Sequence, residues 1–455
     1  MPAVGNGMVP TVMLEYGNPR ESSAEEEKIN RQIVALRNSA SFRLGLLLTN
    51  SIKKPWLIPL LPFTCSSLVW KIWRERTGKK KGKSLETNPN IEVKKRRDAV
   101  VLFPTNGVGM GHFSRMFCLA KSIKRISPNT EIIFFTTNYV LHPVYREGFT
   151  AYHLPNRNKF SDMKPTTWNV QCEEMIANVF SVHRPHTFVF DGAYPYRGML
   201  NAIMGKNEIN RVWVRRISKK KGDKTPVDAY DAFDKIVVPG DQLKPDMDTL
   251  ASWAVEEINL IPPLLSVGKS DLLQKGALRM KLGIPEDAKL ALVILGAGAI
   301  NDIEDLRRLV VESLVEEGAY VVVGDSMLNP DDPVFEHENV RVIQDYPIMR
   351  HRRCFDLAVI AAGYNSVHEA LLLKLPSLII PNLNTKRDNQ IERALKAVKL
   401  GGMMVIESSN PKLIKLAIQR LMDDSIRADL IDALMKVVLE DGAITLAESI
   451  INEFS

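Results

Sequence analysis

Short apolar runs alternate with stretches of helical periodicity from residue 99 to the C-terminus, and residues 1–97 lack this alternation. Such a pattern is typical of parallel α/β folds, in which helices connect successive strands. In the first half, strands are predicted at 99–104, 131–137, 187–191, 211–216 and 235–240. In the second half, they are predicted at 290–298, 319–325, 340–345, 357–363 and 377–382.

The two sets of strands are separated by Ile261-Pro262-Pro263, which we interpret as a linker. We therefore expect an α/β protein with two Rossmann-like, doubly wound domains, at residues 98–263 and 264–455, after an N-terminal extension at 1–97. Two such sheets facing each other leave a cleft, and ligands of these folds bind at the carboxyl ends of the strands.

The N-terminal extension has a helical pattern over residues 22–48 and then an apolar segment at 53–73. That segment has the length of a membrane span, but its three prolines would break a membrane-spanning helix. Its tryptophans and flanking lysines suit the membrane surface instead. In the alternative interpretation, residues 57–69 pack on the main body and the basic residues form a solvated linker.

The charge distribution along the chain supports a membrane surface as the partner of the N-terminal extension. Residues 1–97 hold 18 lysines and arginines against eight acidic residues, so the whole positive excess of the chain, +7, lies there. A nucleic-acid enzyme more often carries its positive charge on the main body, so no nucleic-acid partner is expected. Basic side chains at residues 53–97 would each add about 1 kcal/mol of attraction near an anionic membrane.

The cysteines and the N-terminus bear on localisation. Four widely spaced cysteines without a C-x-x-C pair indicate neither a disulfide framework nor a zinc site. The first residues lack the basic and apolar regions of a signal peptide. We expect a cytoplasmic protein that is peripherally associated with the inner face of the cell membrane.

The first chemical motif follows the strand at 99–104, where Gly107, Gly109 and Gly111 precede a helix. Glycines at such a turn let backbone N–H groups and the helix N-terminus approach an anion or a sugar oxygen. His112 follows directly and is the candidate catalytic base, since an imidazole can take a proton from an attacking hydroxyl. Positioning of a ligand and helix capping remain alternative roles for His112. Arg115 would pair with a phosphate or form a salt bridge.

The second motif lies within residues 355–402, where a strand, a turn, a helix and a further strand follow one another. Gly363, Asn365 and Ser366 stand at the strand-to-helix turn, whose N–H groups and helix dipole favour a diphosphate. Glu369 is placed to accept hydrogen bonds from both ribose hydroxyls, or is simply an acidic residue near a helix N-terminus. Three later residues offer groups for sugar hydroxyls: Asp388, Asn389 and Gln390.

Together these motifs resemble the GT-B glycosyltransferase superfamily. The stretch G-x-G-x-G-H-x-x-R-x-x-x-L-A and the segment D-L-A-V-x-x-x-G-x-x-S-x-x-E-A-L, with P-S-x-x-I-P and D-N-Q, are similar to the family 28-like enzymes that include the lipid II-forming N-acetylglucosaminyltransferase. The turn G-Y-N-S-x-H-E resembles bacterial glycosyltransferases of cell-surface polysaccharide pathways. The similarity covers about residues 98–455.

The resemblance implies that the second domain binds a UDP-sugar and the first binds the acceptor. It places Gly298 near the phosphate or ribose, and the backbone at Ile343–Asp345 around the uracil. It assigns the diphosphate, the ribose and the donor sugar to the second motif, and it makes Gly109, Gly111 and Arg115 a phosphate or acceptor loop. One departure is that Ile391 follows Gln390 where the family often has Asn-Ala.

No metal and no cofactor beyond the UDP-sugar co-substrate are expected, because helix dipoles and backbone donors can carry the charge of the leaving diphosphate. The D-x-D sequence Asp246-Met247-Asp248 follows Lys-Pro instead of an apolar strand, so we interpret it as a loop or a helix start.

The expected activity is transfer of a hexose or N-acetylhexosamine from a UDP-sugar to a glycan or lipid-linked acceptor, with inversion, in the synthesis of cell-surface polysaccharide or glycolipid. Three alternatives share these motifs. They are a UDP-sugar hydrolase of nonulosonic acid synthesis, a UDP-sugar 2-epimerase and a non-catalytic accessory subunit of a glycosyltransferase.

Overall fold

The computed structural model describes residues 96–105, 109–215, 228–241, 258–296, 303–324, 335–383 and 389–454, with isolated positions between 45 and 70. The chain divides into two compact units, residues 1–94 and 95–455. The predicted helix at 22–48 lies almost wholly outside the described residues, and only scattered positions of the predicted segment at 53–73 are described. Gly107, Asp246–Asp248, Gly298 and Asp388 also lie outside the described residues. Among the described residues, no helix is both long and apolar enough to cross a membrane.

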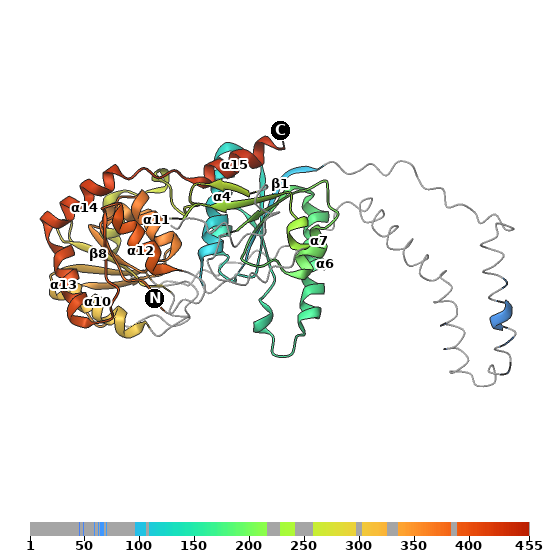
Figure 1. The fold of residues 1–455 in the computed structure, drawn as a ribbon, viewed down its shortest axis with the longest axis horizontal. Coiled ribbons are helices and arrows are strands. Elements are labelled where there is room, and N and C mark those ends of the chain that lie inside the picture. The colour runs from blue at the N-terminus through green and yellow to red at the C-terminus, as the bar shows by residue number, and fades with distance from the viewer. Residues whose placement is uncertain are drawn as a thin grey trace, which may run out of the picture. The chain divides into compact units, whose positions relative to one another are not determined.

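The first sheet has seven parallel strands in the order β3-β2-β1-β4-β5-β6-β7 (Figure 1). All five strands predicted in this half are present. The sequence pattern missed β3 and β7, which form the two edges of the sheet. The strands are β1 (Arg97–Pro104), β2 (Glu131–Thr136), β3 (Thr150–His153), β4 (Pro185–Asp191), β5 (Asn210–Val214), β6 (Lys235–Pro239) and β7 (Ile258–Ile261).

The second sheet has six parallel strands in the order β10-β9-β8-β11-β12-β13. Both sheets thus place their earliest strand in the interior and add later strands on both sides, and the predicted pair of Rossmann-like sheets is confirmed. The strands are β8 (Leu290–Ile294), β9 (Tyr320–Gly324), β10 (Val340–Ile343), β11 (Leu357–Ile360), β12 (Ser377–Ile379) and β13 (Met403–Val405).

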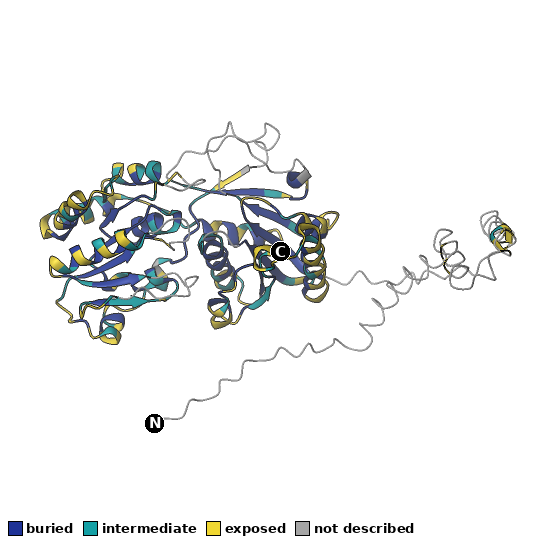
Figure 2. Cartoon of the chain, turned by 90° about the horizontal axis from the view of Figure 1, so that it is seen from below, coloured by how far each residue is buried: buried dark blue, intermediate teal, exposed yellow. Residues whose placement is uncertain are grey.

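Helices cover both faces of the first sheet because successive strand residues point to opposite faces. Val101 and Phe103 of β1 pack with α6 (Pro165–His183) and α7 (Arg197–Ile203). Val100 and Leu102 pack on the other face, against α4 (Gly111–Ile126) and α15 (Gly442–Asn452). Figure 2 shows the strands buried and the outer sides of the helices exposed. Two short helices, α5 (His142–Arg146) and α8 (Asp228–Asp231), complete this half.

The second sheet is covered in the same way. One face packs against α9 (Lys275–Leu282), α11 (Tyr364–Leu372) and α12 (Gln390–Lys399). The other packs against α10 (Glu304–Glu316) and α13 (Pro411–Met422), with α14 (Asp424–Lys436) against α13. Because helices cover both faces of each sheet, polar side chains reach a ligand most readily where strands end and helices begin.

The last helix does not pack with the second sheet. Helix α15 contacts α4 and β7, and Ala443, Leu446 and Ile450 belong to the first sheet's core (Figure 1). The boundary at 263/264 stays a prediction, but residues 442–452 are packed with the first domain.

Candidate active site

The carboxyl ends of β1 and β4 lie side by side at the centre of the first sheet. Pro104, the last residue of β1, is paired in register with Asp191, the last residue of β4. The glycine-containing turn leaves β1 at this point and leads into α4, which begins at Gly111. His112 and Arg115 lie three residues apart in α4 and therefore on one side of the helix.

His112, Arg115 and Asp191 form one hydrogen-bonded cluster. The Nδ1 atom of His112 lies 2.7 Å from Asp191 Oδ1. Arg115 donates from Nε to Asp191 Oδ2 at 2.9 Å and from Nη2 to Oδ1 at 2.7 Å. The side chains of Arg115 and Asp191 are 2% and 1% exposed, whereas that of His112 is 25% exposed. The imidazole is thus the member of the cluster that solvent or a ligand can reach.

Asp191 is ionised in this setting, which determines the proton position on His112. Burial opposes its ionisation, but the charges of Arg115 and His112 and their hydrogen bonds outweigh this effect and hold the pKa of the carboxyl below its ordinary value. Because a carboxylate only accepts hydrogen bonds, it favours the tautomer in which Nδ1 of His112 donates to it, over the one in which Nδ1 accepts from Arg115 Nη2 at 2.8 Å. The Nε2 atom then keeps its lone pair and can act as a base.

Packing against described atoms does not explain why glycine, with no side chain, occupies the positions beside this cluster. No described atom lies within 4 Å of the position that a Cβ of Gly109 would take, and Gly111 would meet only Arg115 Nη1, at 4.0 Å. Their predicted role in a phosphate or acceptor loop stays a prediction.

The second motif forms the N-terminus of α11, as the sequence predicted. Gly363 precedes the helix, and Asn365 and Ser366 lie in its first turn, all partly exposed. The first N–H groups of a helix lack intrahelical acceptors and carry the positive end of its dipole. Asn365 Oδ1 is buried without a hydrogen-bond partner among the described residues. This turn can hold an anionic group.

Tyr364 joins the two motifs. It is the first residue of α11, and its ring centroid lies 5.7 Å from the guanidinium carbon of Arg115. Its hydroxyl donates to the carbonyl oxygen of Gly240, after β6, at 2.6 Å. The fold therefore brings the His112 cluster and the α11 turn together, although about 250 residues of chain separate them.

Glu369 is buried, whereas a carboxylate that binds a ligand must be accessible to it. The residue is 5% exposed and accepts a hydrogen bond from the hydroxyl of Ser266, in the segment after β7. Burial raises the pKa of Glu369 to about 7, although the Ser266 hydrogen bond works in the opposite direction. Its predicted contact with ribose stays a prediction.

The remaining described candidates have structural contacts of their own. Asn389 caps α12 by accepting a hydrogen bond from Glu392 N at 3.3 Å. Gln390 Oε1 accepts from Asn382 N at 3.0 Å. Ile343 ends β10 and packs against the second sheet's core. Gly298 and Asp388 lie outside the described residues, so the donor-sugar and phosphate roles given to them stay predictions.

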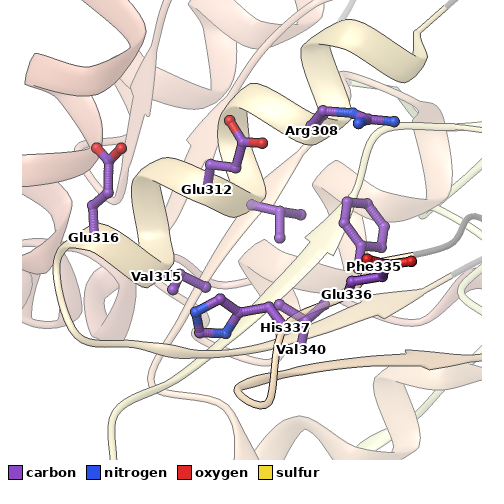
Figure 3. Close-up of a pocket in the computed structure, with 9 residues that line it drawn as sticks. Arg308, Glu312, Val315, Glu316, Phe335, Glu336, His337 and Val340 are labelled. Atoms are coloured by element: carbon purple, nitrogen blue, oxygen red, sulfur yellow. The ribbon is translucent and has the colours of Figure 1, made fainter.

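A pocket of 640 Å³ lies elsewhere in the second domain, between α10 and the segment before β10 (Figure 3). None of the predicted site residues lines it, and its carboxylates Glu312, Glu316 and Glu336 suit an anionic diphosphate poorly. The α11 turn is the better candidate for the donor. The pocket is lined by Arg308, Val311, Glu312, Val315, Glu316, Phe335, Glu336, His337 and Val340.

Asp191 is the candidate site residue that the sequence analysis missed. The run at 187–191 was predicted as a strand, and its last residue is a carboxylate at a carboxyl end, where ligands of such sheets bind. That position was the available signal. The pairing with His112 was not visible, because 79 residues separate the two.

Comparison with known proteins finds similarity to sugar transferases. No family model matches. Over 356 residues the chain is 22% identical to the UDP-N-acetylglucosamine–N-acetylmuramyl-(pentapeptide) pyrophosphoryl-undecaprenol N-acetylglucosamine transferase of Clostridioides difficile, covering 71% of this chain and 81% of that protein.

Two solved structures share the fold of the chain. A glycosyltransferase of kitacinnamycin matches with a TM-score of 0.53 and 16% identity, over 79% of this chain and 100% of that one. MurG of Acinetobacter baumannii matches with a TM-score of 0.51 and 12% identity, over 78% and 99%. At these identities the structural matches bear on the fold alone.

Proposed function

We propose that this GT-B-fold chain, which is distantly related to the lipid II-forming N-acetylglucosaminyltransferases, transfers a hexose or N-acetylhexosamine from a UDP-sugar to a glycan or lipid-linked acceptor. The observation that carries the proposal is the His112–Asp191 pair, held by Arg115 against the first residue of α11. A base and an anion-binding turn thus occupy one site.

In the proposed reaction, Nε2 of His112 accepts the proton of an acceptor hydroxyl as the hydroxyl oxygen bonds to the anomeric carbon of the donor sugar. The bond from that carbon to the UDP oxygen breaks, and UDP leaves with the electron pair. Asp191 stabilises the imidazolium that forms. The N–H groups at the start of α11 stabilise the negative charge that develops on the diphosphate.

A direct displacement of this kind inverts the anomeric centre. Only one base is positioned in the described site, and no carboxylate lies beside it as a nucleophile, since Asp191 is buried and bonded to Arg115 and His112. Inversion is therefore part of the proposal.

The donor and the acceptor class rest on the relatives. The C. difficile protein is named for UDP-N-acetylglucosamine and for an undecaprenol-linked acceptor. We extend this to a UDP-sugar and a polymer or lipid acceptor of the cell envelope. The basic, tryptophan-containing residues 53–97 would hold the enzyme at the cytoplasmic face of the membrane, where a lipid-linked acceptor lies.

The test is a binding panel of UDP-, dTDP-, GDP- and CMP-sugars, followed by thermal unfolding of the wild type, His112→Ala and Glu369→Ala. A ligand at 100 times its Kd should stabilise the fold by about 2.7 kcal/mol. We expect a UDP-sugar to stabilise the wild type and His112→Ala, and Glu369→Ala to lose the response. Acceptors would then be screened by release of UDP.

Other outcomes separate the alternatives. UDP release without any acceptor, at a rate that acceptors do not raise, would indicate a hydrolase. Donor binding without turnover in any mixture would indicate an accessory subunit. If no nucleotide sugar stabilises the wild type, the proposed function is wrong.

A further inference from the structure

Tyr364 contacts the first domain through both its ring and its hydroxyl. The residue is 4% exposed, although it begins a helix that lies beside the predicted diphosphate site. Its hydroxyl is bonded to Gly240 O, and its ring lies 5.7 Å from the Arg115 guanidinium carbon and 5.9 Å from that of Arg393. Two arginines therefore lie against one aromatic ring.

Arg115 connects this ring to the base. Its guanidinium is planar and makes two directed hydrogen bonds to Asp191, at 2.9 and 2.7 Å. A displacement of the guanidinium would therefore alter the carboxylate that orients the His112 imidazole. The contacts run without interruption from Tyr364 through Arg115 and Asp191 to His112.

The start of α11 is itself fixed by groups of both domains. Arg393 is fully buried, donates to both carboxylate oxygens of Asp241 and donates from Nη1 to Ala362 O at 2.8 Å. Asp241 directly follows Gly240, which accepts the Tyr364 hydrogen bond. The helix turn that would receive a diphosphate is thus attached to the end of β6 on one side and to Arg115 on the other.

Resting on the proposed function, we propose that Tyr364 is a positioning residue that couples donor binding at the N-terminus of α11 to the alignment of His112. A diphosphate bound to the first turn of α11 acts on Tyr364, which is part of that turn. The ring then fixes the plane of Arg115, and Arg115 and Asp191 orient the imidazole toward the acceptor. Tyr364 touches neither reacting atom in this scheme.

The coupling predicts different effects for the ring and the hydroxyl. Tyr364→Phe keeps the ring against Arg115 and removes the hydrogen bond to Gly240, so it should retain the response of His112. Tyr364→Leu removes the ring and leaves the backbone N–H groups that bind the diphosphate. It should keep UDP affinity but lose turnover by about 100-fold, the effect of misplacing a catalytic group by about 1 Å.

The experiment is NMR of protein labelled with nitrogen-15 at its eight histidines, titrated with UDP, alongside calorimetric measurement of UDP affinity. The His112→Ala variant identifies the His112 ring signals by their loss. We expect UDP to shift these signals in the wild type and in Tyr364→Phe, and to leave them unshifted in a UDP-saturated Tyr364→Leu variant. Thermal unfolding verifies folding, and Tyr364→Met replaces Tyr364→Leu if the latter does not fold.

Three results would overturn the coupling while leaving the donor assignment intact. The first is a wild-type His112 signal that UDP does not shift, and the second is a Tyr364→Leu variant that responds like the wild type. The third is a Tyr364→Phe variant that is as defective as Tyr364→Leu. The last would mean that the hydroxyl contact with Gly240, a structural contact, matters instead of the ring. A wild type that binds no UDP would instead contradict the proposed function itself.

Discussion

The imidazole of His112 can accept a proton at Nε2 only while Nδ1 carries the other one. Asp191 favours this arrangement because it is a buried carboxylate 2.7 Å from Nδ1, although Nη2 of Arg115, a competing donor, lies 2.8 Å from the same atom. Arg115 keeps the carboxylate charged, since without a cation a fully buried carboxyl would favour its neutral form. The three residues therefore have distinct roles: a base, the group that orients it and the cation that maintains the charge.

Asp191→Asn should abolish most turnover without removing donor binding. An asparagine can donate to Nδ1, which favours the proton on Nε2 and blocks the base. We expect kcat to fall by about 10²–10⁴ while the thermal shift with UDP-sugar is kept. Asp234→Asn is the matched control, because Asp234 also pairs with an arginine, Arg211, but does not contact His112. Near wild-type turnover in Asp191→Asn would refute the assigned role.

Glu369 should make the protein less stable as the pH rises. The unfolded chain loses this proton near pH 4.5, whereas burial raises the pKa in the folded chain to about 7. Between these values the folded state holds more protons, so the free energy of unfolding falls with increasing pH and then levels off above pH 7. Glutamine in its place does not titrate and can still accept from Ser266.

Glu369→Gln is therefore expected to gain about 1–3 kcal/mol of stability relative to the wild type at about pH 8, and to lose most of this gain at about pH 5. Urea unfolding at the two pH values measures it. Glu440→Gln, at an exposed carboxyl, serves as the control. A gain of equal size at both values would show that titration of Glu369 is not its cause.

At the scale of elements, most of the strands that the sequence predicted are buried on both faces, and the half-buried edge strand β10 is the exception. In β1, β4 and β8 nearly every residue is buried, because helices cover both faces of the sheet at these strands. The missed strands β3, β7 and β13 lie at sheet edges and have three or four residues each. β3 and β7 carry no continuous apolar run, and the run in β13 is only three residues long, so periodicity alone could not identify these strands.

The α12 N-terminus shows how a capping role and a ligand role can be separated. Asn389 was predicted to bind a donor sugar, and its side chain caps α12. Asn389→Ala should cost about 1 kcal/mol of stability from loss of the cap. If the sugar contact also exists, the affinity for a UDP-sugar should fall more than that for UDP.

Asn410→Ala supplies the comparison for this experiment. Asn410 caps α13 by accepting from Lys412 N at 3.0 Å, with no predicted ligand role. It should lose similar stability and bind both nucleotides like the wild type. If Asn389→Ala binds UDP and the UDP-sugar with the same affinities as Asn410→Ala, Asn389 is a helix cap only.

At the scale of the whole molecule, contacts between the two sheets determine whether the base and the donor site face one another. Asp271 of the second domain lies 2.7 Å from both Lys121 Nζ and Arg125 Nη2 of α4. Tyr346 packs against Phe113 and Phe117 of the same helix. The sequence did not predict such pairs, because in the sequence each side chain is indistinguishable from an ordinary surface charge or core aromatic residue.

The C-terminal helix adds a further connection, and its first residue leaves no space for a side chain. Helix α15 follows the second domain in sequence but packs on the first sheet's core. Gly442 donates to Pro263 O at 2.9 Å, and a Cβ added there would lie 2.0 Å from Pro262 O. The start of α15 is thus pressed directly against the segment that links the two sheets.

Gly442→Ala should therefore displace the start of α15 from the linker and reduce the free energy of unfolding by about 1–3 kcal/mol. Gly276→Ala is the matched control, because Gly276 lies in α9 and no described atom is within 4 Å of its added Cβ. That variant should be neutral or slightly more stable. Urea unfolding of both proteins measures the difference. Equal free energies of unfolding for the two variants would mean that the contact between α15 and the linker contributes no stability. The contacts of α4 and α11 would then hold the domains together instead.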